Sequence, residues 1–336
     1  MPLVPDIVDG NRYAVILAGG DAIRLRGLTR RITGRPTPKQ FCPVVGGSTL
    51  LEQTMRRVAL EFSPKRTIVV LTRHHRDLYA DQVKLPDAQL VIQPENRGTG
   101  SAILYAVLRI AKHDPDATVT VFPSDHYVDD ERTFMSQARH SAHMAGLEYA
   151  RLVLLGIRPD RTESGYGWIE PAAPFDGCKL FRVARFWEKP PKTMADKLWR
   201  QGCLWNSFVL SGTPRCFVKM ANRAALSVRQ ALSSAWHVLG TSEEAHVIER
   251  IYANLPDCDF SRDILVPNAR SLAVLPVQGV YWNDLGDPQR VYETLARTQI
   301  RPEWITRGTT RSRNSLIRWQ LRRITLVRGN ARTRPH

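Results

Sequence analysis

Two acidic residues beside apolar runs are the first candidates for chemistry. Asp125 follows the apolar run 118–122 and a Pro-Ser turn, and Asp284 lies in the run Trp-Asn-Asp-Leu-Gly at 282–286. A carboxylate at the end of a buried strand suits Mg²⁺, which takes carboxylate and phosphate oxygens together. The alternative is a turn or helix-capping aspartate at position 125 and a turn aspartate at position 284. The fold decides whether the two carboxylates converge on one metal.

A paired-glycine turn and two basic side chains are candidates for holding a phosphate. The apolar run 13–18 leads straight into glycines at 19 and 20, and Arg24 stands four positions further on. Glycines let backbone N–H groups approach an anion closely, and a guanidinium adds a fork that fits phosphate. Lys39, in a proline-stiffened segment, offers a compact positive charge. A solvated lysine is the simpler interpretation.

Three further segments could line a ligand. The run 93–99 joins a strand to a helix, with Thr99 either as its N-cap or within a loop that contacts a base or ribose. Glu188 and Lys189 end a strand, and because adjacent strand residues point to opposite faces, they need not pair and could each reach a ligand. Trp-Asn-Ser at 205–207 is either strand packing with a polar edge or part of the same site.

Alternating strands and helices must position these groups. Short apolar runs without period-two alternation predict strands buried on both faces, and helical spacing separates them. Ser48 or Thr49, followed by Glu52, resembles a capping box. Such alternation predicts a mostly parallel sheet with helices on both faces. The strands are expected at 13–18, 67–72, 89–93, 118–122 and 151–157, and the helices at 49–62, 99–113 and 131–145.

The regular alternation of strands and helices ends at about residue 157. Strands are expected at 165–169, 180–187 and 272–277, and helices at 192–201, 214–222 and across much of 224–255. Because no repeat or low-complexity linker interrupts the chain, we expect one domain over residues 1–300 and a basic, poorly ordered tail over 301–336.

Composition favours an ordinary globular protein of a reducing compartment. Of the 336 residues, 43% are hydrophobic and 24% charged, and no apolar run is long enough to cross a membrane. The five cysteines form no C-x-x-C pair, and the first residues lack the regions of a secretion signal, so we expect a cytoplasmic protein. P-loop, zinc-protease and nucleophile-elbow patterns are absent.

The net charge of +16 is concentrated at one end. Residues 301–336 hold ten arginines and one acidic residue, which is +9 of that total. This tail is the one feature that points to nucleic acid, and a solvated tail is favoured over it. The moderately basic remainder suits an enzyme for phosphorylated substrates.

The order of these motifs resembles the sugar-1-phosphate nucleotidyltransferases, and most closely the mannose-1-phosphate guanylyltransferases. The resemblance covers about residues 13–295 and implies an α/β nucleotide-diphospho-sugar transferase fold, a Rossmann-like mixed, mostly parallel sheet flanked by helices. It implies that a sugar 1-phosphate, here mannose 1-phosphate, reacts with a nucleoside triphosphate, here GTP, with Mg²⁺ as cofactor. A homodimer is one oligomeric state that it allows. The motifs are Leu-Ala-Gly-Gly at 17–20 with Arg24, Pro-Lys-Gln-Phe at 38–41, Gln-Pro-Glu-Asn-Arg-Gly-Thr at 93–99, Pro-Ser-Asp-His at 123–126, Gly-Tyr-Gly at 165–167, Phe-Trp-Glu-Lys-Pro at 186–190, Trp-Asn-Ser at 205–207 and Trp-Asn-Asp-Leu-Gly at 282–286.

The resemblance also implies roles for single residues. The sugar phosphate oxygen would attack the α-phosphorus in line, so catalysis would consist of positioning and charge stabilisation. The catalytic residues would be Arg24, Lys39, Asp125 and Asp284, the two aspartates also holding the metal. The nucleotide would contact Leu17, Ala18, Gly19, Gly20, Arg24, Gln93, Asn96, Gly98 and Thr99, and the sugar phosphate Gly167, Glu188, Lys189 and Asn206.

The chain departs from this family's usual pattern at several positions. Ala22 and Ile23 replace a glycine and a threonine of the phosphate loop, and Phe208 stands where glycine often follows Trp-Asn-Ser. If position 22 needs a positive φ, alanine there costs on the order of 1 kcal/mol or opens the loop. The alternative function is therefore a catalytically weakened paralogue that binds nucleotide or nucleotide sugar in a regulatory or assembly role.

Overall fold

The computed structural model of the protein describes residues 11–147 and 151–305, which form two compact units. The larger unit comprises residues 11–20, 55–124, 130–147 and 151–280, and the smaller unit comprises 21–54, 125–129 and 281–305. The prediction of a single domain over 1–300 stays a prediction. Most of the predicted basic tail, from residue 306 on, lies outside the described residues.

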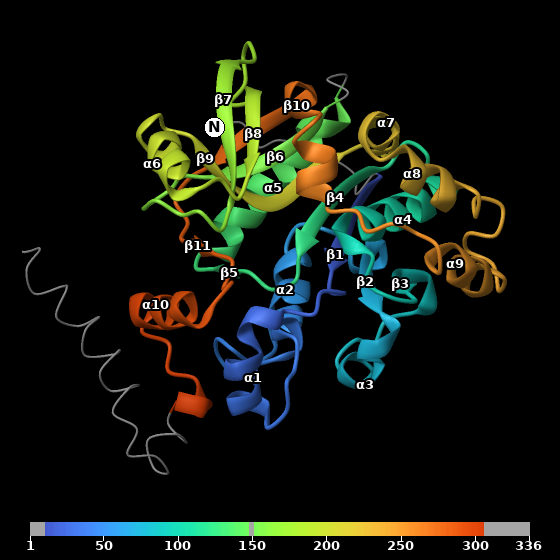
Figure 1. Ribbon diagram of the computed structural model, residues 1–336, viewed down its shortest axis with the longest axis horizontal. Coiled ribbons are helices and arrows are strands. Elements are labelled where there is room, and N and C mark those ends of the chain that lie inside the picture. Colours follow the sequence, from blue (N-terminus) through green and yellow to red (C-terminus); the bar gives the residue numbers. More distant parts are fainter. Residues whose placement is uncertain (1–10, 148–150, 306–336) are drawn as a thin grey trace, which may run out of the picture. The chain divides into compact units, whose positions relative to one another are not determined.

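A nine-stranded mixed sheet forms the centre of the larger unit (Figure 1). Its strand order is β3-β2-β1-β4-β9-β6-β10-β8-β7, and β7 also pairs with β9. Strands β3, β2, β1 and β4 pair in parallel, as do β6 and β10, and the remaining pairings are antiparallel. The strands are β1 (Arg12–Leu17), β2 (Thr67–Thr72), β3 (Leu90–Gln93), β4 (Thr118–Pro123), β6 (Leu152–Ile157), β7 (Gly167–Pro174), β8 (Phe181–Glu188), β9 (Leu204–Gly212) and β10 (Leu272–Val277).

The predicted α/β class is confirmed, but the sheet is less parallel than predicted. Apolar runs located β1, β2, β3, β4, β6 and β10 to within one residue at each end. The antiparallel pairings include those of β9 with β4 and β6, between which it lies, and the pairing of β7 with β8. The full length of β9 was missed because Trp-Asn-Ser at 205–207 interrupts its apolar pattern.

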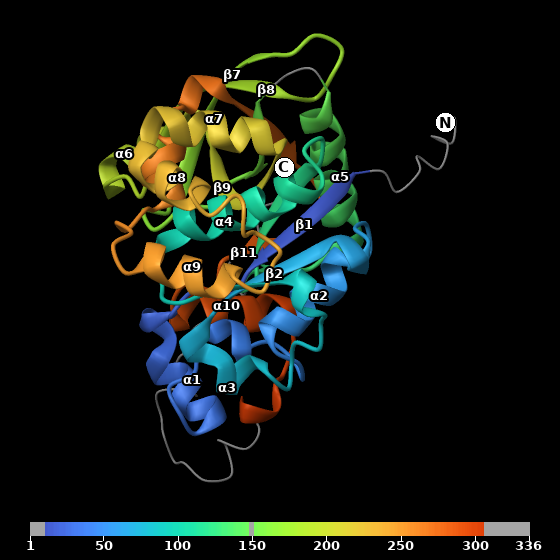
Figure 2. The same ribbon diagram turned by 90° about the vertical axis from the view of Figure 1, so that its right-hand side faces the viewer.

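Helices cover both faces of this sheet. Helices α4, α7 and α8 pack together on one face (Figure 2) and share a core with Val119 and Val121 of β4. Thr120, between these two valines, points to the opposite face, toward α5. There the Ser211 hydroxyl lies 2.9 Å from the Thr120 hydroxyl and 2.8 Å from the Ser141 hydroxyl. The helices of this unit are α3 (Arg76–Tyr79), α4 (Gly98–His113), α5 (Glu131–Gly146), α6 (Lys192–Arg200), α7 (Pro214–Ala224), α8 (Leu226–Ser233) and α9 (Glu244–Tyr252).

The smaller unit is built from short elements around its own apolar core. It contains α1 (Arg26–Thr33), α10 (Pro288–Thr298) and a two-stranded sheet of β5 (Tyr127–Val128) and β11 (Trp282–Asn283). Its buried core includes Leu25, Leu50 and Leu285. Helix α2 (Leu50–Val58) begins in this unit and ends in the larger one.

The predicted capping box at the start of α2 is confirmed. The backbone N–H of Thr49 donates to the Glu52 carboxylate at 2.8 Å, and the N–H of Glu52 donates to the Thr49 hydroxyl at 3.3 Å. None of the helices within the described ranges is long and apolar enough to cross a membrane.

Candidate active site

Pairing of β5 with β11 brings the two candidate metal carboxylates into one neighbourhood. Tyr127 lies opposite Asn283 in this antiparallel pair. Asp125 precedes Tyr127 by two residues, and Asp284 follows Asn283 directly. The segments that carry the two carboxylates therefore lie side by side within the smaller unit, and a shared metal stays a prediction.

Lys39 connects these two segments. Its ammonium lies 3.3 Å from an Asp125 carboxylate oxygen, and it donates to the backbone carbonyls of Asp284 at 2.5 Å and Leu285 at 3.3 Å. The lysine sits in a single 3₁₀ turn that follows Pro38, and it is only 7% exposed. A charged lysine is rarely buried without such partners. The solvated-lysine interpretation is thus wrong, and Lys39 belongs to the carboxylate cluster.

Arg290 is a member of this cluster that sequence reasoning missed. One of its guanidinium nitrogens donates to both Asp284 carboxylate oxygens, at 2.8 and 2.9 Å, and its Nε lies 3.3 Å from Asp287. Burial alone would raise the pKa of Asp284, but Lys39, Arg290 and nearby His126 lower it, and the net shift is downward. Asp284 is therefore held as a carboxylate. The spacing of Asp284, Asp287 and Arg290 at the start of α10 was the available signal.

The two carboxylates differ in how well they fit a divalent cation. Asp125 is 28% exposed, and each of its oxygens has one long polar contact, to Lys39 at 3.3 Å and to His126 at 3.5 Å. This leaves lone pairs for a hard cation such as Mg²⁺. Asp284 is 15% exposed and also accepts the Gly286 N–H at 2.8 Å, so it would have to share its oxygens with Arg290. The fit to Mg²⁺ is good at Asp125 and conditional at Asp284.

The predicted phosphate loop runs from one unit into the other. Gly20 is the last residue of its segment of the larger unit, and Asp21 begins the smaller one. Arg24 lies in a 3₁₀ turn of the smaller unit, exposed and without an ion pair to any other residue in the described ranges. It is available to an anionic ligand.

Gly19, two residues beyond β1, has little room for a side chain. A Cβ there would lie 2.7 Å from the Thr72 hydroxyl and 2.8 Å from the Gln93 side-chain nitrogen. The Thr72 hydroxyl donates to the Gly19 carbonyl at 3.0 Å. A Cβ at Gly20, by contrast, would meet nothing within 4 Å. The first glycine of the pair is constrained by its neighbours, whereas a side chain at the second would have room.

Gln93 is oriented by a tyrosine that the sequence did not identify. The fully buried Tyr252 donates its hydroxyl to the Gln93 side-chain oxygen at 3.3 Å, which leaves the nitrogen directed toward Gly19. Leu17 and Ala18 are held by backbone bonds of the same strand end, from Ser124 at 3.2 Å and to Val70 at 2.8 Å. The predicted nucleotide-side residues at 17–20 and 93 thus meet at one edge of the sheet.

The start of α4 differs from the prediction. The helix begins at Gly98 with Arg97 as its N-cap, and the Asn96 side chain accepts the Gly98 N–H at 3.0 Å. The Thr99 hydroxyl accepts the N–H of Phe260 at 2.9 Å, so Thr99 as the N-cap is wrong. Gly98 has a φ of +83°, and a Cβ there would clash with the Cys258 carbonyl. This loop is therefore tied to the 258–260 segment.

The predicted sugar-side residues Gly167, Glu188 and Asn206 lie together in the larger unit. A Cβ on Gly167 would come within 3.0 Å of the Glu188 carboxylate and 3.3 Å of the Asn206 Cβ. The register of β6 and β9 shifts at this point, and the Asn206 side chain accepts the N–H of Phe208 at 3.1 Å. Asn206 thus supports a bulge beside the candidate sugar site.

The expectation that Glu188 and Lys189 need not pair is wrong. Their side chains form an ion pair at 2.9 Å. Lys189 lies one residue beyond β8 with a φ of +45°, so strand alternation no longer holds there. Glu188 remains the more buried partner, with 17% exposure against 55% for Lys189.

Positive-φ residues other than glycine gather at the motifs of the candidate site. Six occur in the described ranges, and four of them lie within or beside these motifs. Such backbone conformations cost about 1–3 kcal/mol each and concentrate at functional sites. The four are Ala22 (+46°), Lys189 (+45°), Phe208 (+60°) and Leu285 (+49°).

The chain combines a glycine turn at the end of a parallel strand with a cluster of carboxylates and cations. This combination is typical of α/β proteins that handle phosphorylated ligands. The family model described as "Nucleotidyl transferase" matches residues 13–299. The chain belongs to this nucleotidyl transferase family, as its motif order indicated.

Known relatives and a solved structure are similar along most of the chain. The xanthan biosynthesis protein XanB of Xanthomonas campestris pv. campestris (strain B100) is 30% identical over 81% of this chain and 57% of its own length. The mannose-1-phosphate guanylyltransferase of Escherichia coli (strain K12) is 29% identical over 85% and 60%. A crystal structure titled mannose-1-phosphate geranyltransferase, from Thermus thermophilus, has a TM-score of 0.73 at 29% identity, covering 86% of this chain and 79% of that one. The chain thus spans somewhat more than half the length of these curated relatives.

Proposed function

We propose that the protein is a nucleotidyltransferase that joins mannose 1-phosphate to GTP, releasing pyrophosphate and forming a nucleotide sugar. The observation that carries this proposal is the cluster of Lys39, Asp125 and Asp284 in a chain of the nucleotidyl transferase family. The relatives named mannose-1-phosphate guanylyltransferase support the choice of sugar and base. We also propose a cytoplasmic location, supported by the five free cysteines.

The proposed reaction needs positioning and charge, with no protein nucleophile. A sugar phosphate oxygen attacks the α-phosphorus of the nucleotide, and the bond to the departing pyrophosphate breaks. Mg²⁺, bound at Asp125 with Asp284 nearby, would neutralise phosphate charge and hold the phosphates in line. Arg24 and Lys39 would supply further positive charge to the triphosphate and to pyrophosphate. Glu188 and Asn206 would orient the sugar phosphate.

Pyrophosphate release with a matrix of nucleoside triphosphates and sugar 1-phosphates tests this proposal. GTP with mannose 1-phosphate should give the highest kcat/KM. Asp125→Asn should lower it about 100-fold or more, because charge stabilisation at the reacting phosphates is lost. Asp116→Asn makes the same change at an exposed turn residue and should leave the rate unchanged. No pyrophosphate from any substrate pair would refute the enzymatic proposal.

A second candidate function is favoured by Ala22, whose φ of +46° is a conformation in which glycine is preferred. We propose as the alternative a weakened paralogue that binds nucleotide or nucleotide sugar without efficient turnover. The double variant Ala22→Gly with Ile23→Thr separates the two. A large gain in kcat supports the weakened paralogue, and an unchanged kcat supports a loop that is already competent.

A further inference from the structure

Five strands of the large sheet close into a ring. β9 pairs with β6, β6 with β10, β10 with β8, β8 with β7, and β7 returns to β9. Side chains of alternate residues along each strand therefore point into the ring. The contact that a Cβ on Gly156 would make with Leu204 and Val274 shows that these two side chains point inward.

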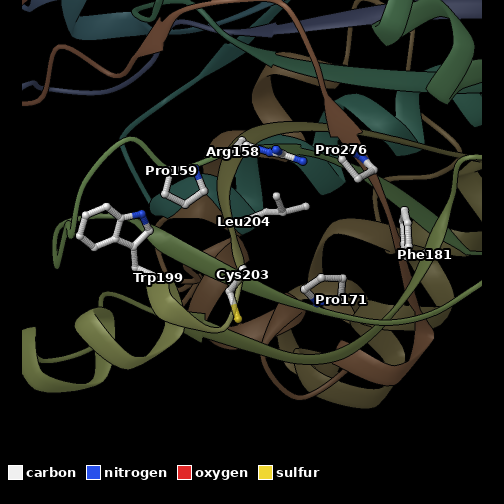
Figure 3. Close-up of a pocket in the computed structure, with 9 residues that line it drawn as sticks. Arg158, Pro159, Pro171, Phe181, Trp199, Cys203, Leu204 and Pro276 are labelled. Carbon is white, nitrogen blue, oxygen red and sulfur yellow. The ribbon is translucent and has the colours of Figure 1, made fainter. Parts of the chain in front are cut away.

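A cavity of about 500 Å³ opens at one mouth of this ring. The register places its lining residues on the inner face, since Pro276 lies opposite Gly156 and Phe181 opposite Val274. Figure 3 shows these side chains arranged around the cavity. Every strand of the ring contributes a residue, β7 from its middle and the others from at or near an end, and α6 adds an aromatic ring. The lining consists of Arg158, Pro159, Pro171, Phe181, Trp199, Gly202, Cys203, Leu204 and Pro276.

Most of the lining cannot donate a hydrogen bond. Three lining residues are prolines, which carry no N–H. The N–H groups of Gly202 and Cys203 are already bonded to the carbonyls of Trp199 and Leu198, at 3.0 and 3.1 Å. Burial raises the pKa of the Cys203 thiol to about 11, so this group stays neutral.

Arg158 is the one charged residue of the lining. It follows β6 directly, is exposed, and forms no ion pair with another residue in the described part of the chain. A guanidinium beside an apolar wall suits a ligand that combines an acid group with an apolar body. The apolar wall includes the planar aromatic rings of Phe181 and Trp199, which favour a rigid, flat ligand.

We propose that this cavity binds a small aromatic carboxylate. The carboxylate pairs with Arg158, and the aromatic body lies against Phe181, Leu204 and Trp199. A volume of about 500 Å³ is within the range that encloses such a molecule. This site shares no residue with the candidate active site and stands independently of the proposed function.

Titration calorimetry of the full chain with 2-naphthoate tests the proposal, with neutral 2-naphthylmethanol as the comparison. The naphthoate should bind at one site. Arg158→Gln should weaken its binding at least about tenfold and leave the alcohol unaffected, because only the charge-assisted hydrogen bond is removed. Trp199→Ala should weaken both compounds.

Arg200→Gln is the matched control, since it removes an exposed arginine from the residue next to Trp199. It should change naphthoate binding by less than about twofold, since exposed charges at a distance are screened. Absence of naphthoate binding at millimolar concentration overturns the proposal. Equal weakening by Arg158→Gln and Arg200→Gln overturns it too, because binding would then follow net charge rather than the cavity.

Discussion

Replacing Ala22 by glycine should measure the strain held in the phosphate loop. Ala22 has a φ of +46° and a ψ of +45°, and it makes no side-chain cap bond to the 3₁₀ turn that follows. A left-handed conformation costs an L-residue about 1–2 kcal/mol, which glycine does not incur. Glycine also has more freedom in the unfolded chain, which costs about 0.4–1 kcal/mol of stability. The two terms partly cancel, so Ala22→Gly alone should leave stability unchanged or raise it by up to about 1.6 kcal/mol.

A second alanine-to-glycine variant separates the backbone strain at Ala22 from the entropy that glycine adds to the unfolded chain. Ala253 is exposed at the end of α9 with a φ of −55°, so Ala253→Gly carries the entropic cost without any relief. Urea unfolding followed by circular dichroism should therefore separate the two variants by about 1–2 kcal/mol, with equal m-values. Equal destabilisation of both variants would refute the reasoning, because Ala22 would then hold no strain.

Three further predictions concern buried groups. Arg290→Met should destabilise the protein by about 3–5 kcal/mol in urea unfolding, because it leaves the Asp284 carboxylate buried without its partner, whereas Arg290→Lys should retain part of that stability. Because folding lowers the pKa of Asp284, its carboxylate stabilises the folded protein above the unfolded pKa of 3.8, and this stabilisation is lost as the pH falls below that value. The difference in unfolding free energy between wild type and Asp284→Asn should therefore shrink below about pH 4. A difference that stays constant would contradict this prediction. Tyr252→Phe should raise the nucleotide KM more than it lowers kcat, because Gln93 loses its orienting hydrogen bond, and an unchanged KM would argue against that role.

Much of the fold could be predicted because strong local patterns determine it. Apolar runs located six strands, and the Thr49–Glu52 capping box formed as expected, since both depend on nearby residues. The full length of β9 was missed because Asn206 and Ser207 are polar and buried. The Ser207 hydroxyl donates to the Leu155 carbonyl, 52 residues away, and that partner cannot be foreseen from the local pattern.

The candidate site was predictable in its motifs and less so in its contacts. Convergence of Asp125 and Asp284 depends on the β5–β11 pair, two residues per strand, which leaves no periodic signal. Thr99 was assigned to a cap because threonine favours that position, but Phe260 provides a donor from far along the chain. Strand alternation wrongly placed Glu188 and Lys189 on opposite faces, because the strand ends at Glu188 and Lys189 has a positive φ.

The smaller unit is built from three separate segments of the chain, so its last segment is synthesised after the larger unit is complete. Its carboxylate cluster combines residues near 39, 125 and 284, whereas the larger unit is complete at residue 280. Chains grow at about 5–20 residues per second and domains fold as they emerge. The sheet can therefore form on the ribosome while Lys39 and Asp125 still lack Asp284, Arg290 and α10. The larger unit can therefore fold before the contacts of Lys39 with the 284–285 segment have formed.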